Sequence, residues 1–231
     1  ENTRAAHAVL TAAGYNVISP EPINNERPLC CGRTFFSSGM LNEARKEAER
    51  MLTALQPYIE KGVPIIGIEP SCLLTLRDEF LSLIPGPRTQ ALANNAFLME
   101  EFLVREHNDG NLQLSLKPIK AKQALLHGHC YQKAFAMMSD VQQVLSLIPE
   151  LKVDTIKSGC CGMAGSFGYE AEHYDTSMQM GELDLFPAVR KADSDTLIVA
   201  DGTSCRDQIQ HGTGRDALHI ARVLEWALVS H

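Results

Sequence analysis

The chain has 231 residues, of which 45% are hydrophobic and 21% charged, and its formal net charge is −7. Such a composition is typical of a globular protein with one large core or two smaller ones. The acidic balance gives no electrostatic footprint for nucleic acid. No apolar run approaches the roughly 18 residues that a membrane-spanning helix needs. We therefore expect neither a nucleic-acid partner nor a transmembrane segment.

The first half of the chain alternates between helical and extended patterns. The predicted elements are a helix at 3–13, a strand at 15–18, a helix at 41–59 and a strand at 63–68. Gly14 and Gly62 end the two helices. The peptide Glu69-Pro70-Ser71-Cys72 follows the second strand, so Cys72 is expected at a strand-to-helix turn.

The second half repeats this alternation. It predicts a strand at 124–127, a helix at 130–148, a strand at 151–156, a long helix near 170–191, a strand at 196–200 and a closing helix at 215–229. Strands separated by helices indicate parallel α/β units, whose sites usually lie in loops beyond the carboxyl ends of the strands. All seven cysteines are expected in such loops.

Two candidate linkers, 84–95 and 108–120, divide the chain. We expect an α/β fold of two pseudo-repeated Rossmann-like lobes with mainly parallel strands, over residues 1–115 and 116–231. Cys130 lies 23 positions before Val153, and the same count back from Val17 falls before Glu1. Since the chain also opens on glutamate, the first lobe is expected to be truncated at its N-terminus.

Cysteine pairs followed by glycine occur twice, as Cys30-Cys31-Gly32 and Cys160-Cys161-Gly162. One further cysteine lies downstream of each pair, Cys72 and Cys205, and the two sets are offset by 130 and 133 positions. Thiolates are the soft ligands that zinc and iron-sulfur clusters select. Adjacent cysteines rarely form ordinary structural disulfides, and an odd total of seven leaves one unpaired. The sequence thus indicates a metal site and a reducing, cytoplasmic location.

The motifs resemble those of the cysteine-rich CCG domain, which occurs twice in one of the subunits of heterodisulfide reductase. It also occurs in iron-sulfur subunits of glycolate and lactate oxidation systems and at the C-terminus of fused FAD-linked oxidases. The stretches that look most like the last group are PLCCGRTFFSSGMLNEA, GIEPSCLLTLRDEF, LLHGHCYQKA and SGCCGMAGSFGYEAEHY.

This resemblance implies an iron-sulfur electron-transfer module of an FAD-linked 2-hydroxy-acid dehydrogenase of the glycolate or lactate type. In such systems a flavin domain oxidises the hydroxy acid and iron-sulfur centres pass the electrons onward. Nothing in the chain resembles a flavin-binding segment. We therefore expect FAD only on an upstream domain or partner, and no catalysis by this chain alone.

The chain departs from the fullest family pattern, in which each lobe ends in CxxC. Here Glu69-Pro70-Ser71-Cys72 and Gly202-Thr203-Ser204-Cys205 each lack one cysteine. Lobe two keeps Cys130, Cys160, Cys161 and Cys205, enough for a 4Fe-4S cluster but not for a five-cysteine noncubane one. Lobe one has only Cys30, Cys31 and Cys72, and needs a further ligand such as Glu69 or an upstream residue.

Other residues near these motifs have more than one interpretation. His127 and His129 lie near Cys130 in the sequence. Each suits a metal ligand, an outer-shell donor or a plain hydrogen-bonding residue. Glycines 162, 165 and 168 would let backbone N–H groups approach a cofactor. Asp201 suits a site residue or a helix cap, whereas His211 and His219 are expected at the surface. Arg33, Arg77 and Arg206 follow cysteines and suit solvated faces or an anionic partner.

Three hypotheses for the function remain at this point. The first is the electron-transfer module, with lobe two as the better-formed site. The second is a zinc-bound or metal-free scaffold that docks onto a flavoprotein. The third is a thiol redox module of the heterodisulfide type, which the lack of a dedicated CxxC makes weaker.

Overall fold

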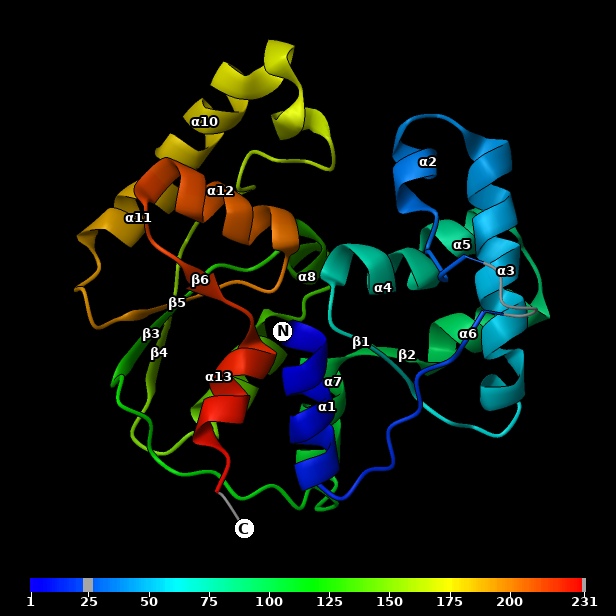
Figure 1. Cartoon of the computed structure of the whole chain (residues 1–231), viewed down its shortest axis with the longest axis horizontal. Coiled ribbons are helices and arrows are strands. Elements are labelled where there is room, and N and C mark those ends of the chain that lie inside the picture. The colour runs from blue at the N-terminus through cyan, green and yellow to red at the C-terminus, as the bar shows by residue number, and fades with distance from the viewer. Residues whose placement is uncertain (23–26, 230–231) are drawn as a thin grey trace. The chain divides into compact units, whose positions relative to one another are not determined.

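The computed structural model describes residues 1–22 and 27–229, and confirms the predicted α/β class with parallel strands (Figure 1). The chain forms two compact units, Glu1–Val17 with Glu100–His231 (unit 1) and Ile18–Met99 (unit 2). These units do not coincide with the predicted lobes 1–115 and 116–231. The first helix, α1 (Asn2–Ala12), packs against the last, α13 (Ile220–Ala227), and so belongs to unit 1. The sequence repeat stays a prediction.

Unit 1 is built on a parallel sheet with the strand order β4-β3-β5-β6. Its strands are β3 (Gln123–Leu126), β4 (Lys152–Thr155), β5 (Leu197–Val199) and β6 (Ala217–Leu218). In the central strand, Ala124 is in register with Val153 on one side and Leu197 on the other. The buried side chains of β3 and β5 are apolar because helices cover both faces of the sheet.

The helices of unit 1 lie on both faces of this sheet (Figure 1). They are α7 (Met99–Asn108), α8 (Cys130–Ala134), α9 (Met138–Ser146), α10 (Tyr174–Leu183), α11 (Leu185–Lys191) and α12 (Thr203–Thr213), besides α1 and α13. Helices α10, α11 and α12 pack together, and α13 packs against α1 and α9. The chain leaves β3 toward β4 and then crosses to β5 on the other side of β3. The topological switch point, where α/β sheets usually bind ligands, therefore lies between β3 and β5.

Unit 2 has a two-stranded parallel sheet of β1 (Ile65–Gly67) and β2 (Ala96–Leu98). Its helices are α2 (Arg33–Ser37), α3 (Leu41–Ile59), α4 (Pro70–Arg77), α5 (Glu79–Leu83) and α6 (Pro87–Asn95). Leu74, Phe80, Leu92 and Leu98 are completely buried in its core. The predicted linker 84–95 is therefore wrong, because Pro87 occupies the first position of α6, where its fixed φ favours a helix.

Two predicted long helices are each divided in the structure. The helix at 130–148 is interrupted at Ala136, which has a φ of 56°, and becomes α8 and α9. The helix near 170–191 becomes two short 3-10 turns, Phe167–Tyr169 and Ala171–His173, followed by α10 and α11. Pro187 explains the second break, since its ring would clash with the carbonyl of Leu183 in a continuous helix.

Two smaller predictions also differ from the structure. Residues 15–18 form no strand, and Tyr15 instead donates a hydrogen bond to Glu106 of α7 at 3.1 Å. The closing helix begins at Ile220 rather than 215, because β6 precedes it.

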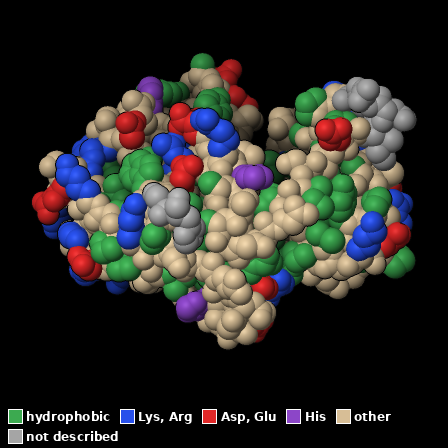
Figure 2. Space-filling view, turned by 60° about the horizontal axis from the view of Figure 1, so that its bottom comes forward, with side chains coloured by type: hydrophobic (Ala, Val, Ile, Leu, Met, Phe, Trp, Pro, Cys, Tyr) green, Lys and Arg blue, Asp and Glu red, His purple; other side chains and the backbone are tan. Residues whose placement is uncertain are grey.

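The surface carries charges of both signs. Figure 2 shows both lysine or arginine and aspartate or glutamate side chains on the face in view, with tan and green areas between them. Among the described residues, no helix is both long enough and apolar enough to cross a membrane.

Candidate metal centre

Four cysteines of unit 1 meet at the carboxyl edge of its sheet. Cys130 is the first residue of α8, which follows β3, and Cys160 and Cys161 lie in the loop after β4. Cys205 lies in the first turn of α12, which follows β5. The cysteines therefore surround the switch point between β3 and β5. The structure brings together all four lobe-two residues that the sequence singled out.

The thiols of unit 1 form a chain of contacts. Cys130 and Cys161 both hydrogen-bond to Cys160, which lowers the pKa of Cys160 and raises the pKa values of Cys130 and Cys161. Cys161 also hydrogen-bonds to Cys205, the next thiol in the series, and this bond lowers the pKa of Cys205. His127 contacts the Cys205 sulfur and lowers its pKa too. The order of contacts is Cys130, Cys160, Cys161, Cys205, His127.

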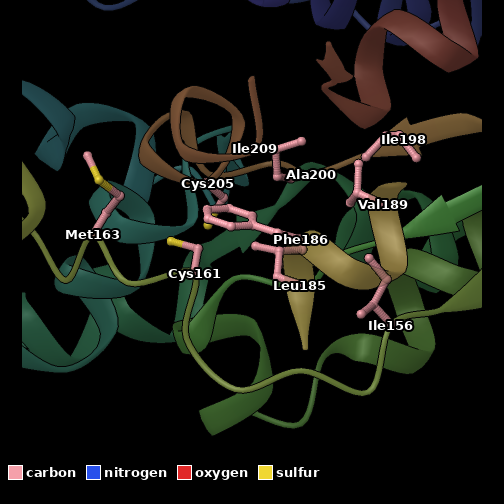
Figure 3. Packing of buried hydrophobic residues seen from close by; sticks show 10 residues of the cluster. All are labelled: Ile156, Cys161, Met163, Leu185, Phe186, Val189, Ile198, Ala200, Cys205 and Ile209. Carbon is pink, nitrogen blue, oxygen red and sulfur yellow. The ribbon is translucent and has the colours of Figure 1, made fainter. Parts of the chain in front are cut away.

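The donor atoms at the buried end of this series of contacts lie closest together. One donor atom from each of His127, Cys161 and Cys205 lies within 4.8 Å of the others, and all three residues are buried. Figure 3 shows Cys161 and Cys205 beside the ring of Phe186, in the apolar cluster that also contains Val189. Cys160 is partly buried and Cys130 is exposed, so the cysteines extend from the core to the surface. All seven cysteines of the chain are free thiols.

A tight turn presents each cysteine pair. The amide nitrogen of Gly162 lies 3.4 Å from the Cys160 sulfur, and the amide nitrogen of Gly32 lies 3.4 Å from the Cys30 sulfur. Both glycines have positive φ, 103° at Gly162 and 73° at Gly32. A backbone N–H directed at a thiolate stabilises its negative charge and lowers the pKa, as it does at Cys160. The CCG sequence thus encodes the same local turn in both units.

Lys133 of α8 holds the loop that leads into the Cys160-Cys161 pair. Its ammonium donates to the carbonyl oxygens of Ser158 and Gly159, both at 2.7 Å. Burial lowers the pKa of Lys133, and the nearby cysteines act in the opposite direction. Lys133 therefore fixes the loop and also places a positive charge near the thiolates. This role could not be predicted from the sequence, since a lysine three positions after a cysteine carries no distinctive signal.

A buried polar network lies behind Cys130. The amide nitrogen of Gln132 donates to Glu100 at 2.6 Å and to Asp201 at 2.9 Å, and its oxygen accepts from the N–H of His129 at 2.9 Å. Gln132 and both carboxylates are at most 1% exposed. Burial, and then the nearby charge of Asp201, raises the pKa of Glu100 well above its ordinary value. The network connects the helix that begins with Cys130 to the loop that leads to Cys205.

Two further histidines cap helices. The Nδ1 of His129 accepts the N–H of Tyr131 at the start of α8, and the Nδ1 of His219 accepts the N–H of Ala221 at the start of α13. The prediction that His219 lies at the surface is wrong, because it is 2% exposed beneath α13 and near Asp201. His211 is exposed, as expected, and bonds to Tyr174. Asp201 accepts the N–H of Ile220 at 3.0 Å, which confirms a capping role.

Unit 2 brings together its own three cysteines less completely. Cys31 hydrogen-bonds to Cys72, which raises the pKa of Cys31 and lowers that of Cys72. Cys30 and Cys72 are exposed, whereas Cys31 is buried. Glu69, the predicted fourth ligand, caps α4 by accepting hydrogen bonds from the N–H and hydroxyl of Ser71.

The arginines that follow the cysteines have two different surroundings. The positive charge of Arg33 opposes the rise in the pKa of Cys31 and contributes to the fall in the pKa of Cys72. Arg206 instead donates to the carbonyl oxygen of Ala200 at 3.0 Å and to the hydroxyl of Thr203 at 3.1 Å. Arg206 therefore stabilises the loop between β5 and α12 by hydrogen bonds.

The donor set of unit 1 fits a metal cluster. Four thiols in a linear series of contacts and one buried imidazole supply soft ligands, which iron and zinc prefer. The backbone N–H groups of Gly162 and Ala164 contact Cys160, as donors to the sulfurs of a negatively charged cluster would. The three thiols of unit 2 leave a fourth ligand to be supplied by another group.

Comparisons with known proteins agree with the cysteine motifs. Residues 1–77, which include Cys30, Cys31 and Cys72, match the family model of the CCG cysteine-rich domain. One subunit of the anaerobic glycerol-3-phosphate dehydrogenase from Escherichia coli K12 is 29% identical over 95% of this chain and 53% of its own length. D-2-hydroxyglutarate dehydrogenase from Pseudomonas putida is 30% identical over 85% of this chain and 18% of its own length.

A third relative is matched over most of both chains. Lactate utilization protein A from Bacillus velezensis is 23% identical over 96% of this chain and 91% of its own length. By contrast, the chain spans about half the length of the glycerol-3-phosphate dehydrogenase subunit and less than a fifth of the hydroxyglutarate dehydrogenase. No solved structure matches the chain. Residues 1–77 are therefore similar to the CCG family of cysteine-rich domains, the family that the cysteine motifs predicted.

Proposed function

We propose that the chain is the electron-transfer module of an FAD-linked dehydrogenase, with a 4Fe-4S cluster bound by unit 1. The observation that carries this proposal is the contact chain of Cys130, Cys160, Cys161 and Cys205 at the carboxyl edge of the sheet. Four thiolates are the ligand set of a 4Fe-4S cluster. A cluster of this kind accepts and donates one electron at a time. The relatives named as dehydrogenases support a redox role for the chain.

The residues around the thiols would set the properties of such a centre. The N–H groups of Gly162 and Ala164 and the ammonium of Lys133 stabilise negative charge at the sulfurs. Phe186 and its apolar neighbours exclude water from Cys161 and Cys205. Cys130 is exposed, so the centre would be nearest to solvent, and to a redox partner, at that thiol.

The proposed partner is a flavoprotein domain or subunit. Oxidation of a 2-hydroxy acid to a 2-oxo acid transfers two electrons to a flavin, and the reduced flavin can release them singly to a one-electron carrier. The flavin would lie on that partner and the substrate would be oxidised there. Seven free thiols favour a reducing compartment, and we propose the cytoplasm.

We further propose that residues 1–115 and 116–231 are repeats and that lobe two holds the working site. The same turn presents both cysteine pairs, with glycine N–H to sulfur distances of 3.4 Å in each. Cys72 and Cys205 are each the third residue of the helix that follows a strand. Cys30, Cys31 and Cys72 provide one thiol fewer than lobe two, so a cluster there needs an additional ligand.

Anaerobic purification followed by metal and sulfide analysis tests the proposal. We expect a brown protein with iron and acid-labile sulfide in comparable amounts, and a visible absorbance that dithionite bleaches. A colourless protein with stoichiometric zinc would contradict it. The compact group of His127, Cys161 and Cys205 favours zinc as the second candidate, since tetrahedral zinc sites use these ligand types. A protein without metal would instead support the docking scaffold or the thiol redox module.

A further inference from the structure

Among the buried histidines that the structure describes, His127 differs from His129 and His219 in its surroundings. It follows β3 directly, and its backbone N–H donates to the carbonyl of Val199 in β5 at 2.8 Å. This bond continues the sheet ladder by one residue and fixes the position of the histidine between the two strands of the switch point. His129 and His219 use Nδ1 to accept backbone N–H groups at helix starts, and the same nitrogen of His129 lies 3.9 Å from the Cys130 sulfur.

The His127 ring is oriented for metal binding. Its Nδ1 lies 2.9 Å from the hydroxyl of Ser158, and the residue is 1% exposed. Because Ser158 occupies Nδ1, the nitrogen left for the cysteines is Nε2. Metal-binding histidines characteristically hydrogen-bond through the nitrogen that does not bind the metal, which fixes the tautomer and the ring orientation. Here that partner comes from the loop that leads into Cys160.

The sulfurs that His127 meets are at the buried end of the contact chain. Its donor atom and those of Cys161 and Cys205 lie within 4.8 Å of one another. In a tetrahedral site with metal-to-ligand distances of about 2.0–2.3 Å, ligand atoms are about 3.5–4 Å apart, so this group has nearly the dimensions of three ligands on one metal ion. A buried histidine packed for shape alone would not need this position.

We propose that His127 is a ligand of the unit 1 metal centre, a fifth donor besides Cys130, Cys160, Cys161 and Cys205. This inference rests on the proposed function for the identity of the metal. The available donors are then one nitrogen and four sulfurs, with the nitrogen at the buried end and Cys130 at the exposed end. A centre that needs four ligands has one donor in excess, so the loss of either end alone leaves a sufficient set.

Substitution of both ends separates this assignment from a simple hydrogen bond between His127 and Cys205. His127→Phe keeps a ring of similar size and Cys130→Ala removes the exposed thiol. Each single variant should keep most of its iron after anaerobic purification, and the double variant should lose most of it. If His127 only donated a hydrogen bond, Cys130→Ala alone would leave three ligands and lose the iron. That loss from the single variant would overturn the inference.

A spectroscopic measurement on the unaltered protein guards against misfolded variants. Pulsed EPR of the reduced, iron-loaded chain with 15N-labelled histidine should show a directly bound imidazole nitrogen, and His127→Phe should abolish that coupling. His129→Asn, which retains a helix-capping side chain, is the matched control and should keep it. An iron-loaded protein without the coupling, or one in which His127→Phe retains it, would overturn the assignment.

If the centre holds a metal other than iron, the proposed function and the ligand assignment of His127 can be tested separately. If the purified chain holds zinc and no iron, the electron-transfer proposal fails. The ligand assignment is then decided by zinc affinity in the Cys130→Ala background, which His127→Phe should lower at least about tenfold because even the loss of an outer-shell partner has that effect. Unchanged zinc affinity on adding His127→Phe to Cys130→Ala would overturn it.

Discussion

Gly162 and Ser177 approach each other so closely that a Cβ on the glycine would lie 2.2 Å from the carbonyl oxygen of Ser177. Gly162 also has a φ of 103°, which L-residues rarely adopt. Gly162→Ala should therefore lower the free energy of unfolding by about 2–4 kcal/mol, through backbone strain and overpacking. Urea denaturation followed by circular dichroism measures the change.

Gly159 provides the control for this prediction, because a Cβ there would meet no atom within 4 Å. Gly159→Ala should change the free energy of unfolding by less than about 0.5 kcal/mol. Equal effects of the two substitutions would show that the turn at Gly162 does not require glycine.

Lys133→Met should loosen the loop before the Cys160-Cys161 pair. The variant keeps an apolar stem of similar length but loses the hydrogen bonds to the carbonyl oxygens of Ser158 and Gly159. We expect the free energy of unfolding to fall by about 1–2 kcal/mol, and backbone amides of residues 157–161 to exchange hydrogen faster. Hydrogen exchange followed by mass spectrometry measures the second effect.

Lys122→Met is the matched substitution at the surface. Lys122 forms an exposed ion pair with Glu150 at 2.5 Å, and such pairs contribute less than about 1 kcal/mol. Lys122→Met should leave hydrogen exchange at the backbone amides of residues 157–161 unchanged. Faster exchange there in both variants would contradict a specific role for Lys133.

Glu100→Gln should make the protein more stable relative to the original as pH rises. Burial and Asp201 raise the pKa of Glu100 well above its ordinary value, so the folded protein keeps the proton that the unfolded chain releases above about pH 4.3. Below that pH the original protein loses no stability from Glu100. Between that pH and the raised pKa of the folded state, its free energy of unfolding falls by up to about 1.4 kcal/mol per pH unit. Glutamine does not titrate, so the variant does not lose stability in this way.

Urea unfolding of both proteins at a series of pH values from 4 to 8 measures this difference. Glu172→Gln removes a carboxylate from an exposed position and should leave the pH dependence unchanged. A stability difference between Glu100→Gln and the original protein that stays constant with pH would show that Glu100 is ionised in the folded state.

Much of the fold could be predicted from local sequence patterns. The helix at 41–59 and the strands near 65, 124, 153 and 198 match the predicted elements, because apolar periodicity and glycine stop signals act over short distances. The breaks near Ala136 and Pro187 were not predicted, although the proline was visible. The membership of α1 in unit 1 depends on packing against α13 at the other end of the chain. No local pattern reports such a contact.

The candidate site was predictable where its chemistry has a short motif. The CCG pairs and the cysteines after the strands indicated the thiols that unit 1 brings together. Gln132 and Glu100 were missed, since a buried glutamine and a buried glutamate look like ordinary helix residues in the sequence. The burial of His219 beneath α13 could not be predicted, because nothing in the neighbouring sequence shows that this helix covers it.

The central claim, that unit 1 rather than unit 2 holds a redox cluster, is tested most directly by iron and sulfide analysis of two matched double variants. Cys160→Ser with Cys161→Ser removes the pair of unit 1, and Cys30→Ser with Cys31→Ser removes the equivalent pair of unit 2. After anaerobic purification, the first variant should lose most of the iron, sulfide and visible absorbance, and the second should keep most of them. Retention of the cluster in the first variant with its loss from the second would contradict the account.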